Sequence, residues 1–259
     1  VCLGFRQIGM WQPYHHLGRE VFLAPVTWGE EGWFKAGDQG IVTEWMDVDL
    51  DGNQDMDKYH VSFEDVESSY LRWSYLRDYH KENYAFADKR LRIRGTAITL
   101  DEADTPTFVG IRQSEFHTRL KVTVSGQAKE AGVTFYMDES QHYDLSLIQQ
   151  DGKRQIMLRI HVGDAVCAVN TVILPKGEEK AELFVVSDPE KYEFYYTMDG
   201  KKKFLGSART KYLSSEVAGG FTGVLMGLYA VDEDGKWAEF EGLEWKQGEN
   251  KTIDSGKNE

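Results

Sequence analysis

The chain has 259 residues, of which 41% are hydrophobic and 13% aromatic, enough for a sizeable core and against wholesale disorder. Its 43 acidic and 30 basic residues leave a formal net charge of −13, which argues against nucleic acid and anionic membrane surfaces as partners. No apolar run approaches the ~18–20 residues that a membrane-spanning helix needs. Because the chain begins at Val1 rather than methionine, we expect that it was processed or is a fragment. The compartment therefore stays open, bacterial cytoplasmic or secreted.

Residues 1–41 contain short apolar runs, REVFLAPVTW and EGWFKAG, which predict two or three strands. Inside the first run, Arg19 and Glu20 follow Gly18. A guanidinium in such an aromatic-rich segment can donate two hydrogen bonds to vicinal sugar hydroxyls or to a carboxylate. A structural ion pair between Arg19 and Glu20 is the alternative.

Two adjacent histidines precede this pair. In a strand, His15 and His16 would point to opposite faces, so they are not expected to chelate one metal ion together. A structural role in the core or on the surface is the prediction for both.

Residues 42–58 are predicted to form an acidic linker. Its sequence DVDLDGNQDMDK has the D-x-D-x-D-G opening of a calcium loop, with Asp47, Asp49 and Asp51 before Gly52. The twelfth position, which should hold a glutamate, is Lys58. A solvated linker is therefore favoured over a weak calcium site, and no other cofactor or metal is predicted.

Residues 59–247 alternate apolar and polar side chains with period two. HTRLKVTVSG places Leu120, Val122 and Val124 on one face, and comparable alternation follows in GVTFYMD, YDLSL, QIMLRI and YEFYY. The Asp-Gly pairs at 151–152 and 199–200 tolerate the positive φ of tight hairpins. About a dozen strands at this spacing predict an all-β, two-sheet sandwich, followed by a flexible polar tail at 248–259.

A second candidate residue lies in the glycine-rich stretch EVAGGFTGVLMGLYA. Gly219 and Gly220 allow unusual backbone geometry, and Phe221 follows them directly, so the ring is either presented to a ligand or packed in the core. The chain contains no G-x-S-x-G, P-loop, G-x-G-x-x-G or H-E-x-x-H motif. No catalytic residue is therefore nominated.

Five stretches in order resemble glycoside hydrolase family 43: YHHLGREVFLAPVTW with GW after it, LRWSYLRDYHKENY, LRIRGTAITL, TFVGIRQ and LSSEVAGGFTGVLMGLYA. The chain is similar to the β-xylosidases and α-L-arabinofuranosidases that have a C-terminal concanavalin A-like (jelly-roll) sandwich. The resemblance implies that residues 1–41 are the closing segment of a five-bladed β-propeller and that 59–247 are the sandwich.

The same resemblance implies an inverting exo-glycosidase that releases xylose or arabinose from xylan or arabinoxylan oligosaccharides. Its two catalytic aspartates and one glutamate would belong to earlier propeller blades, so this chain alone is expected to be inactive. Arg19 would reach the sugar in the −1 pocket, and Phe221 would stand at the mouth of the active site.

The expected partners are a xylo- or arabino-oligosaccharide and the propeller, and homo-oligomers occur in the family. A stand-alone carbohydrate-binding sandwich and a purely structural or oligomerising domain remain as alternatives.

Overall fold

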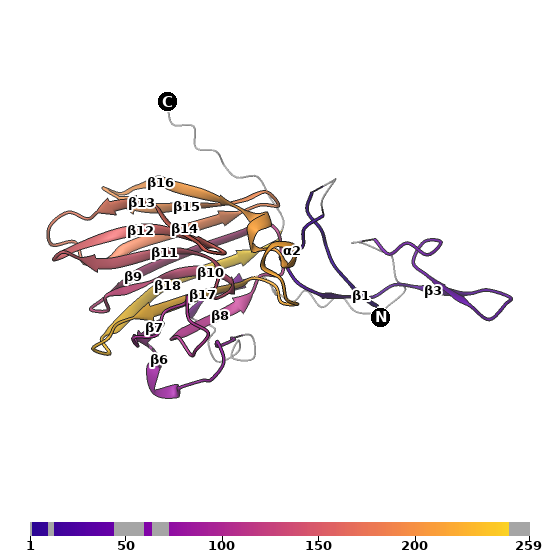
Figure 1. Cartoon of the computed structure of the whole chain (residues 1–259), viewed down its shortest axis with the longest axis horizontal. Coiled ribbons are helices and arrows are strands. Elements are labelled where there is room, and N and C mark those ends of the chain that lie inside the picture. The colour runs from indigo at the N-terminus through magenta and orange to yellow at the C-terminus, as the bar shows by residue number, and fades with distance from the viewer. Residues whose placement is uncertain (1, 10–12, 44–59, 64–72, 249–259) are drawn as a thin grey trace, which may run out of the picture.

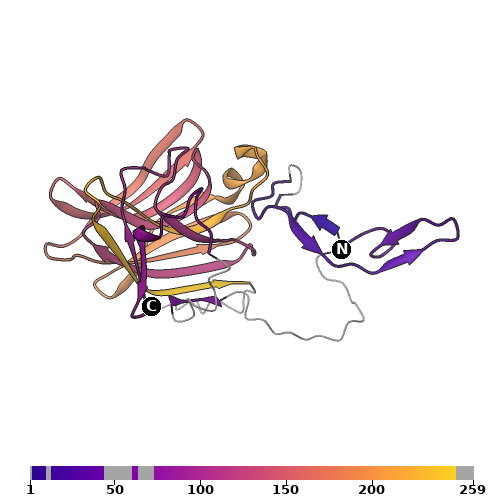
Figure 2. The ribbon, with the colours of Figure 1, turned by 90° about the horizontal axis from the view of Figure 1, so that it is seen from below.

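The computed structural model describes residues 2–9, 13–43, 60–63 and 73–248. The main body of the structure consists of two packed β-sheets with their connections, and an N-terminal arm (residues 2–9 and 13–43) extends away from them in both views (Figures 1 and 2). Within the described ranges, no helix is long and apolar enough to cross a membrane. The predicted all-β class and the sandwich are confirmed.

The first sheet has six strands in the order β13-β12-β11-β10-β17-β8, all pairs antiparallel. In that order the strands are β13 (Ala165–Ile173), β12 (Lys153–Val162), β11 (Gln141–Gln150), β10 (Glu130–Asp138), β17 (Leu225–Val231) and β8 (Phe108–Arg112). Strand β17, near the end of the chain, lies between β10 and the edge strand β8 and joins them into one sheet.

The second sheet has eight strands, with the path β16-β15-β14-β9-β18-β7-β6 and β5 paired to β18. The strands are β16 (Lys201–Arg209), β15 (Lys191–Met198), β14 (Ala181–Ser187), β9 (Thr118–Gly126), β18 (Trp237–Gln247), β7 (Arg90–Arg94), β6 (Tyr84–Ala87) and β5 (His60–Val61). Short helices lie in the connections: the 3-10 turns η3 (Lys81–Asn83) and η4 (Thr210–Leu213), and α2 (Ser215–Ala218).

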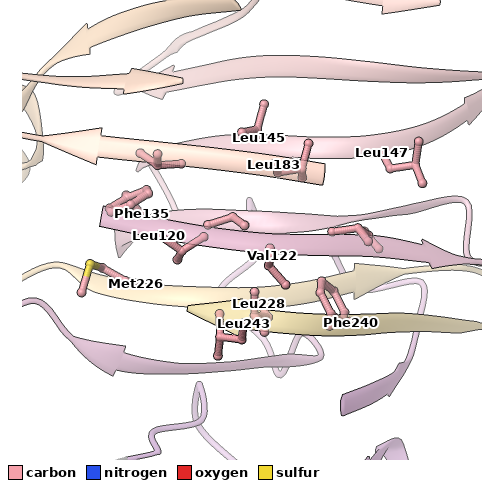
Figure 3. Packing of buried hydrophobic residues seen from close by; sticks show 14 of the residues in the cluster. Leu120, Val122, Phe135, Leu145, Leu147, Leu183, Met226, Leu228, Phe240 and Leu243 are labelled. Carbon is pink, nitrogen blue, oxygen red and sulfur yellow. The ribbon is translucent and has the colours of Figure 1, made fainter. Parts of the chain in front are cut away.

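The core lies between the sheets, where the alternating apolar side chains meet (Figure 3). Leu120, Val122 and Val124 of β9 are at most 2% exposed, as their alternation predicts. The hairpins at Asp151-Gly152 and Asp199-Gly200 have the expected positive φ at both residues, 50° and 71°, and 54° and 68°.

The outward face of β11 is buried, although the apolar–polar alternation of this strand predicts that its polar side chains face solvent. His142, Asp144 and Ser146 occupy the polar positions of this strand, yet all three are 0% exposed. The connections before β8 cover this side of the sheet, since Leu76 and Leu100 pack there against Phe108, Tyr136 and Tyr229. The polar outer face of the six-stranded sheet is therefore buried at this point.

The arm consists of two small antiparallel sheets. Strand β1 (Cys2–Gly4) pairs with β2 (Glu20–Phe22), and β3 (Val26–Trp28) pairs with β4 (Phe34–Ala36). The predicted calcium loop at 47–58, the rest of the linker from 44 onward and tail residues 249–259 lie outside the described residues.

Candidate functional site

The candidate site is the junction at which the arm contacts the sandwich. The backbone N–H of Val224 donates to the carbonyl of His16 at 2.8 Å, and the N–H of Ser215 donates to the carbonyl of His15 at 3.2 Å. Leu17 is 1% exposed there. Residues 15–17 are thus bound to the start of α2 and to the loop that joins α2 to β17, about 200 residues further along the chain.

Two glycines allow this close approach. A Cβ on Gly223 would lie 2.3 Å from the carbonyl oxygen of Leu17, and a Cβ on Gly18 would lie 3.1 Å from the backbone nitrogen of Gly223. Gly18 also has φ +82°, which L side chains rarely adopt. The LGRE and GGFTG motifs therefore contact each other backbone to backbone.

The two predicted binding residues come together at this junction. The guanidinium carbon of Arg19 lies 4.3 Å from the ring centroid of Phe221, and Arg19 Nη1 donates to the Phe221 carbonyl at 3.2 Å. Phe221 is 81% exposed, so it is not packed in the core. Gly219 and Gly220, with φ +81° and +76°, turn the chain outward just before it. This is a cation–π pair on the surface of the sandwich.

Glu20 pairs with Arg6 rather than forming the Arg19–Glu20 ion pair. Arg6 Nη2 is 2.8 Å from Glu20 Oε1, and Arg6 Nη1 is 2.7 Å from Glu115 Oε2 of the sandwich. Arg6 also donates to the carbonyl of Ser114 and lies over the ring of Phe116. Burial alone would lower the pKa of Arg6, but the two carboxylates raise it. Arg6 therefore connects the arm to the sandwich.

The histidines differ in environment. The His15 ring contacts Glu216 Oε1 at 2.5 Å, and its backbone N–H donates to Glu216 Oε2 at 2.8 Å. His16 is 0% exposed, and burial together with the charges of Arg6 and His15 lowers its pKa to about 3. Both have the structural roles predicted for them.

The exposed groups of the junction include a guanidinium and an aromatic ring, both of which can contact a ligand. Its carboxylates, Glu20, Glu115 and Glu216, each contact a basic side chain of this chain. Arg19 has further N–H donors beyond its single bond to Phe221, and a guanidinium donates to hydroxyl or carboxylate oxygens. The exposed ring of Phe221 adds an apolar wall beside these donors.

A separate group of side chains could hold a metal ion. Ligand atoms of Asp101, His142 and His161 lie within 4.8 Å of one another on the buried outer face of the six-stranded sheet. Burial alone would lower the pKa of His142, but Asp144 and Asp101 raise it to about 9, and hydrogen bonds from the two histidines help lower the pKa of Asp101 to about 2.

The sandwich and its junction define a concanavalin A-like domain with an N-terminal arm. Residues 61–246 match the family model of the β-xylosidase C-terminal concanavalin A-like domain, and the chain belongs to that family, within glycoside hydrolase family 43.

Among curated proteins, the chain is 35% identical over 237 residues to the non-reducing end α-L-arabinofuranosidase BoGH43B of Bacteroides ovatus, covering 89% of this chain and 44% of that protein. It is 25% identical over 236 residues to a xylosidase/arabinosidase of Butyrivibrio fibrisolvens, covering 83% and 43%. The chain therefore spans less than half the length of these relatives.

Solved structures show the same relation. The structure described as Bacteroides ovatus xyloglucan PUL GH43B superposes with a TM-score of 0.84 at 32% identity, over 95% of this chain and 50% of that one. A xylan β-1,4-xylosidase from Bacillus halodurans C-125 gives 0.76 at 20% identity over 95% and 50%, which shows the fold alone.

Proposed function

We propose that the chain is the C-terminal portion of an inverting exo-glycosidase of family 43. The enzyme would release xylose or arabinose from xylan or arabinoxylan oligosaccharides, and its catalytic carboxylates would lie in a propeller outside this chain. Arg19 and Phe221 would serve as substrate-binding residues. The observation that carries the proposal is the Arg19–Phe221 stack, which lies where the arm leaves the sandwich.

The arm supports a division of the protein into a propeller segment at 1–41, an acidic linker at 42–58 and a sandwich at 59–247. Several of its large apolar side chains are 66–78% exposed: Leu3, Val21, Trp28, Trp33 and Ile41. A two-stranded sheet is marginally stable in water, and exposed strand edges pair readily with other strands. A neighbouring propeller blade would pair these edges and cover these side chains.

In this arrangement the sandwich closes one side of the propeller's pocket. The loop containing Phe221 would stand at the mouth and restrict access to the short ends of oligosaccharides. Arg19 would donate charge-assisted hydrogen bonds to the bound sugar, and these bonds strengthen where water is excluded. The −13 charge of the chain has little effect on such an uncharged substrate.

The test is Arg19→Ala in the intact protein encoded by the gene that contains this chain. We expect kcat/KM on 4-nitrophenyl β-D-xylopyranoside or 4-nitrophenyl α-L-arabinofuranoside to fall by at least ~100-fold, because a charged contact is lost from a water-poor pocket. Arg92→Ala is the matched control, since Arg92 lies over the Trp237 ring at 5.0 Å, away from the junction. An unchanged kcat/KM in Arg19→Ala would refute the assignment.

The coding DNA upstream of Val1 gives an independent test. An in-frame propeller with its two aspartates and one glutamate would support the proposal. A stop codon directly before Val1 would favour the alternative, a stand-alone carbohydrate-binding sandwich.

The aromatic side chains of the sandwich surface bear on that alternative. Tyr195 and the 57% exposed Phe204 meet at an interplanar angle of 67°, which is not the flat platform on which a polysaccharide stacks. Glycan-array binding by the chain alone would decide whether this or another surface holds a polysaccharide.

A further inference from the structure

A cluster of histidines and carboxylates lies on the buried outer face of the six-stranded sheet, on elements other than the Arg19–Phe221 junction. His142 of β11 and His161 of β12 are register partners, and Asp101 comes from the connection between β7 and β8. The side chains of His142 and His161 are 0% and 10% exposed, and that of Asp101 is 38% exposed. The cluster thus joins a surface connection to the middle of a sheet.

The outer nitrogens of both rings have partners that can only accept a hydrogen bond. His142 Nδ1 lies 3.0 Å from both oxygens of the Asp144 carboxylate, which is 0% exposed and also accepts a hydrogen bond from Arg159 Nε at 2.9 Å. His161 Nε2 lies 2.9 Å from the carbonyl oxygen of Gly163. Each of these nitrogens therefore holds the ring proton.

The inner nitrogens must then offer lone pairs when the rings are neutral. His142 Nε2 and His161 Nδ1 are 3.1 Å apart, and Asp101 Oδ1 lies 3.0 Å from the first and 2.7 Å from the second. Three acceptors facing one another repel unless a proton on a ring nitrogen or a metal cation lies between them. Tetrahedral ligands bound to Zn²⁺ at ~2.0–2.1 Å are roughly 3.3 Å apart, so a small outward rotation of these side chains would admit the ion.

The surrounding charges also favour a divalent cation. Asp144 is shared with Arg159, whose Nη2 is 2.8 Å from Asp144 Oδ2 and 2.7 Å from Glu130 Oε1. Tyr229 donates its hydroxyl proton to Glu130. The carboxylates of Asp101, Glu130 and Asp144 and the guanidinium of Arg159 sum to a formal charge of −2 when both imidazole rings are neutral. A divalent ion would neutralise that charge.

We propose that Asp101, His142 and His161 bind a divalent transition-metal ion, of which Zn²⁺ is the representative. The ligand atoms are Asp101 Oδ1, His142 Nε2 and His161 Nδ1, with a fourth position toward solvent on the side of the half-exposed Asp101. Asp144 and the Gly163 carbonyl orient the rings through their outer nitrogens, as the partners of metal-bound histidines commonly do. Imidazole ligands favour Zn²⁺ over Ca²⁺. The ion would fasten the β7–β8 connection onto strands β11 and β12.

The test is calorimetric titration of the EDTA-treated 259-residue chain with Zn²⁺ at pH 7.5. We expect one saturable site, no comparable binding of Ca²⁺, and a rise in Tm with Zn²⁺. Substitution with Co²⁺ should produce the visible absorption of a nitrogen- and oxygen-ligated ion. Asp101→Asn and His161→Gln should each weaken Zn²⁺ binding at least about 100-fold. His80→Gln is the control, because the His80 side chain is 53% exposed and pairs with Glu82, so this change should leave the affinity unchanged.

Asp101→Asn keeps the test decisive if His161→Gln does not fold, because the Asp101 side chain is partly solvated and the change conserves its shape. Absence of saturable Zn²⁺ binding would overturn the proposal and would leave a proton on His142 Nε2 as the cation of the cluster. Equal Zn²⁺ affinity in Asp101→Asn and the unsubstituted chain would also overturn it. Loss of affinity in His80→Gln as well as in the ligand variants would indicate nonspecific surface binding and would refute the site.

Discussion

Gly223→Ala should release the arm from the sandwich. The added methyl would lie 2.3 Å from the Leu17 carbonyl oxygen and 2.4 Å from the Leu17 carbonyl carbon, where contact ordinarily begins at 3.4 Å. Both neighbours are backbone atoms, so relief requires a displacement of about 1 Å. That displacement would stretch the adjacent hydrogen bond from Val224 N–H to the His16 carbonyl, now 2.8 Å, beyond bonding distance.

The magnitude follows from these two losses. Overpacking in a close contact costs ~1–3 kcal/mol, and a lost hydrogen bond costs ~1 kcal/mol. A total of ~2–4 kcal/mol corresponds to a roughly 30- to 700-fold shift toward the undocked arm. The assay is site-resolved amide hydrogen exchange, because Val224 and Ser215 donate to the arm and should lose protection by that factor.

Gly200→Ala is the control for a glycine substitution as such. Gly200 has φ +68° in a distant hairpin, and a Cβ there meets nothing within 4 Å. We expect local strain at that hairpin and no change in the exchange of Val224. Protection in Gly223→Ala within about fivefold of that in the unsubstituted chain would refute the reasoning that backbone proximity requires glycine at this position.

Two further predictions concern the same junction. First, burial lowers the pKa of His16 to about 3 in the docked arm, below the ordinary histidine value of 6.5. Between these pH values the undocked state binds one proton more, so docking weakens as the pH falls. From pH 7.5 to 5 the loss is ~2 kcal/mol, seen as ~30-fold less protection of Val224 after correction for intrinsic exchange, and His16→Gln should remove this pH dependence. A pH-independent protection factor in the unsubstituted chain would contradict it. Second, Arg6→Met leaves Glu20 and Glu115 without this cation in a partly buried site and should weaken docking by ~1–3 kcal/mol. Adding Glu20→Gln should restore part of that loss, and equal protection in Arg6→Met and the unsubstituted chain would show that the network contributes nothing to docking.

The class of fold could be predicted from the pattern of apolar and polar residues. Period-two alternation identifies which side chains of β9 and β15 face the core, because successive side chains in a strand point to opposite faces. The Asp-Gly hairpins at 151–152 and 199–200 follow from the positive φ that those turns require. The quoted motifs were sufficient to indicate the family and to single out Arg19 and Phe221.

The contacts of these residues could not be predicted, because they depend on how distant segments of the chain pack together. Arg19 and Phe221 lie 202 positions apart, and Arg6 reaches Glu115 across 109 positions. Apolar–polar alternation predicts on which face of a sheet a side chain lies, but not which loop packs against that face. The sequence therefore did not indicate the contacts of Arg6. The nearest signal for the metal cluster was histidine and aspartate two residues apart, at 142 and 144, but such polar positions usually face solvent. They are buried here because the connections before β8 fold over that side of the sheet. Burial strengthens the electrostatic interactions between these groups, because the protein interior has a lower dielectric constant than water.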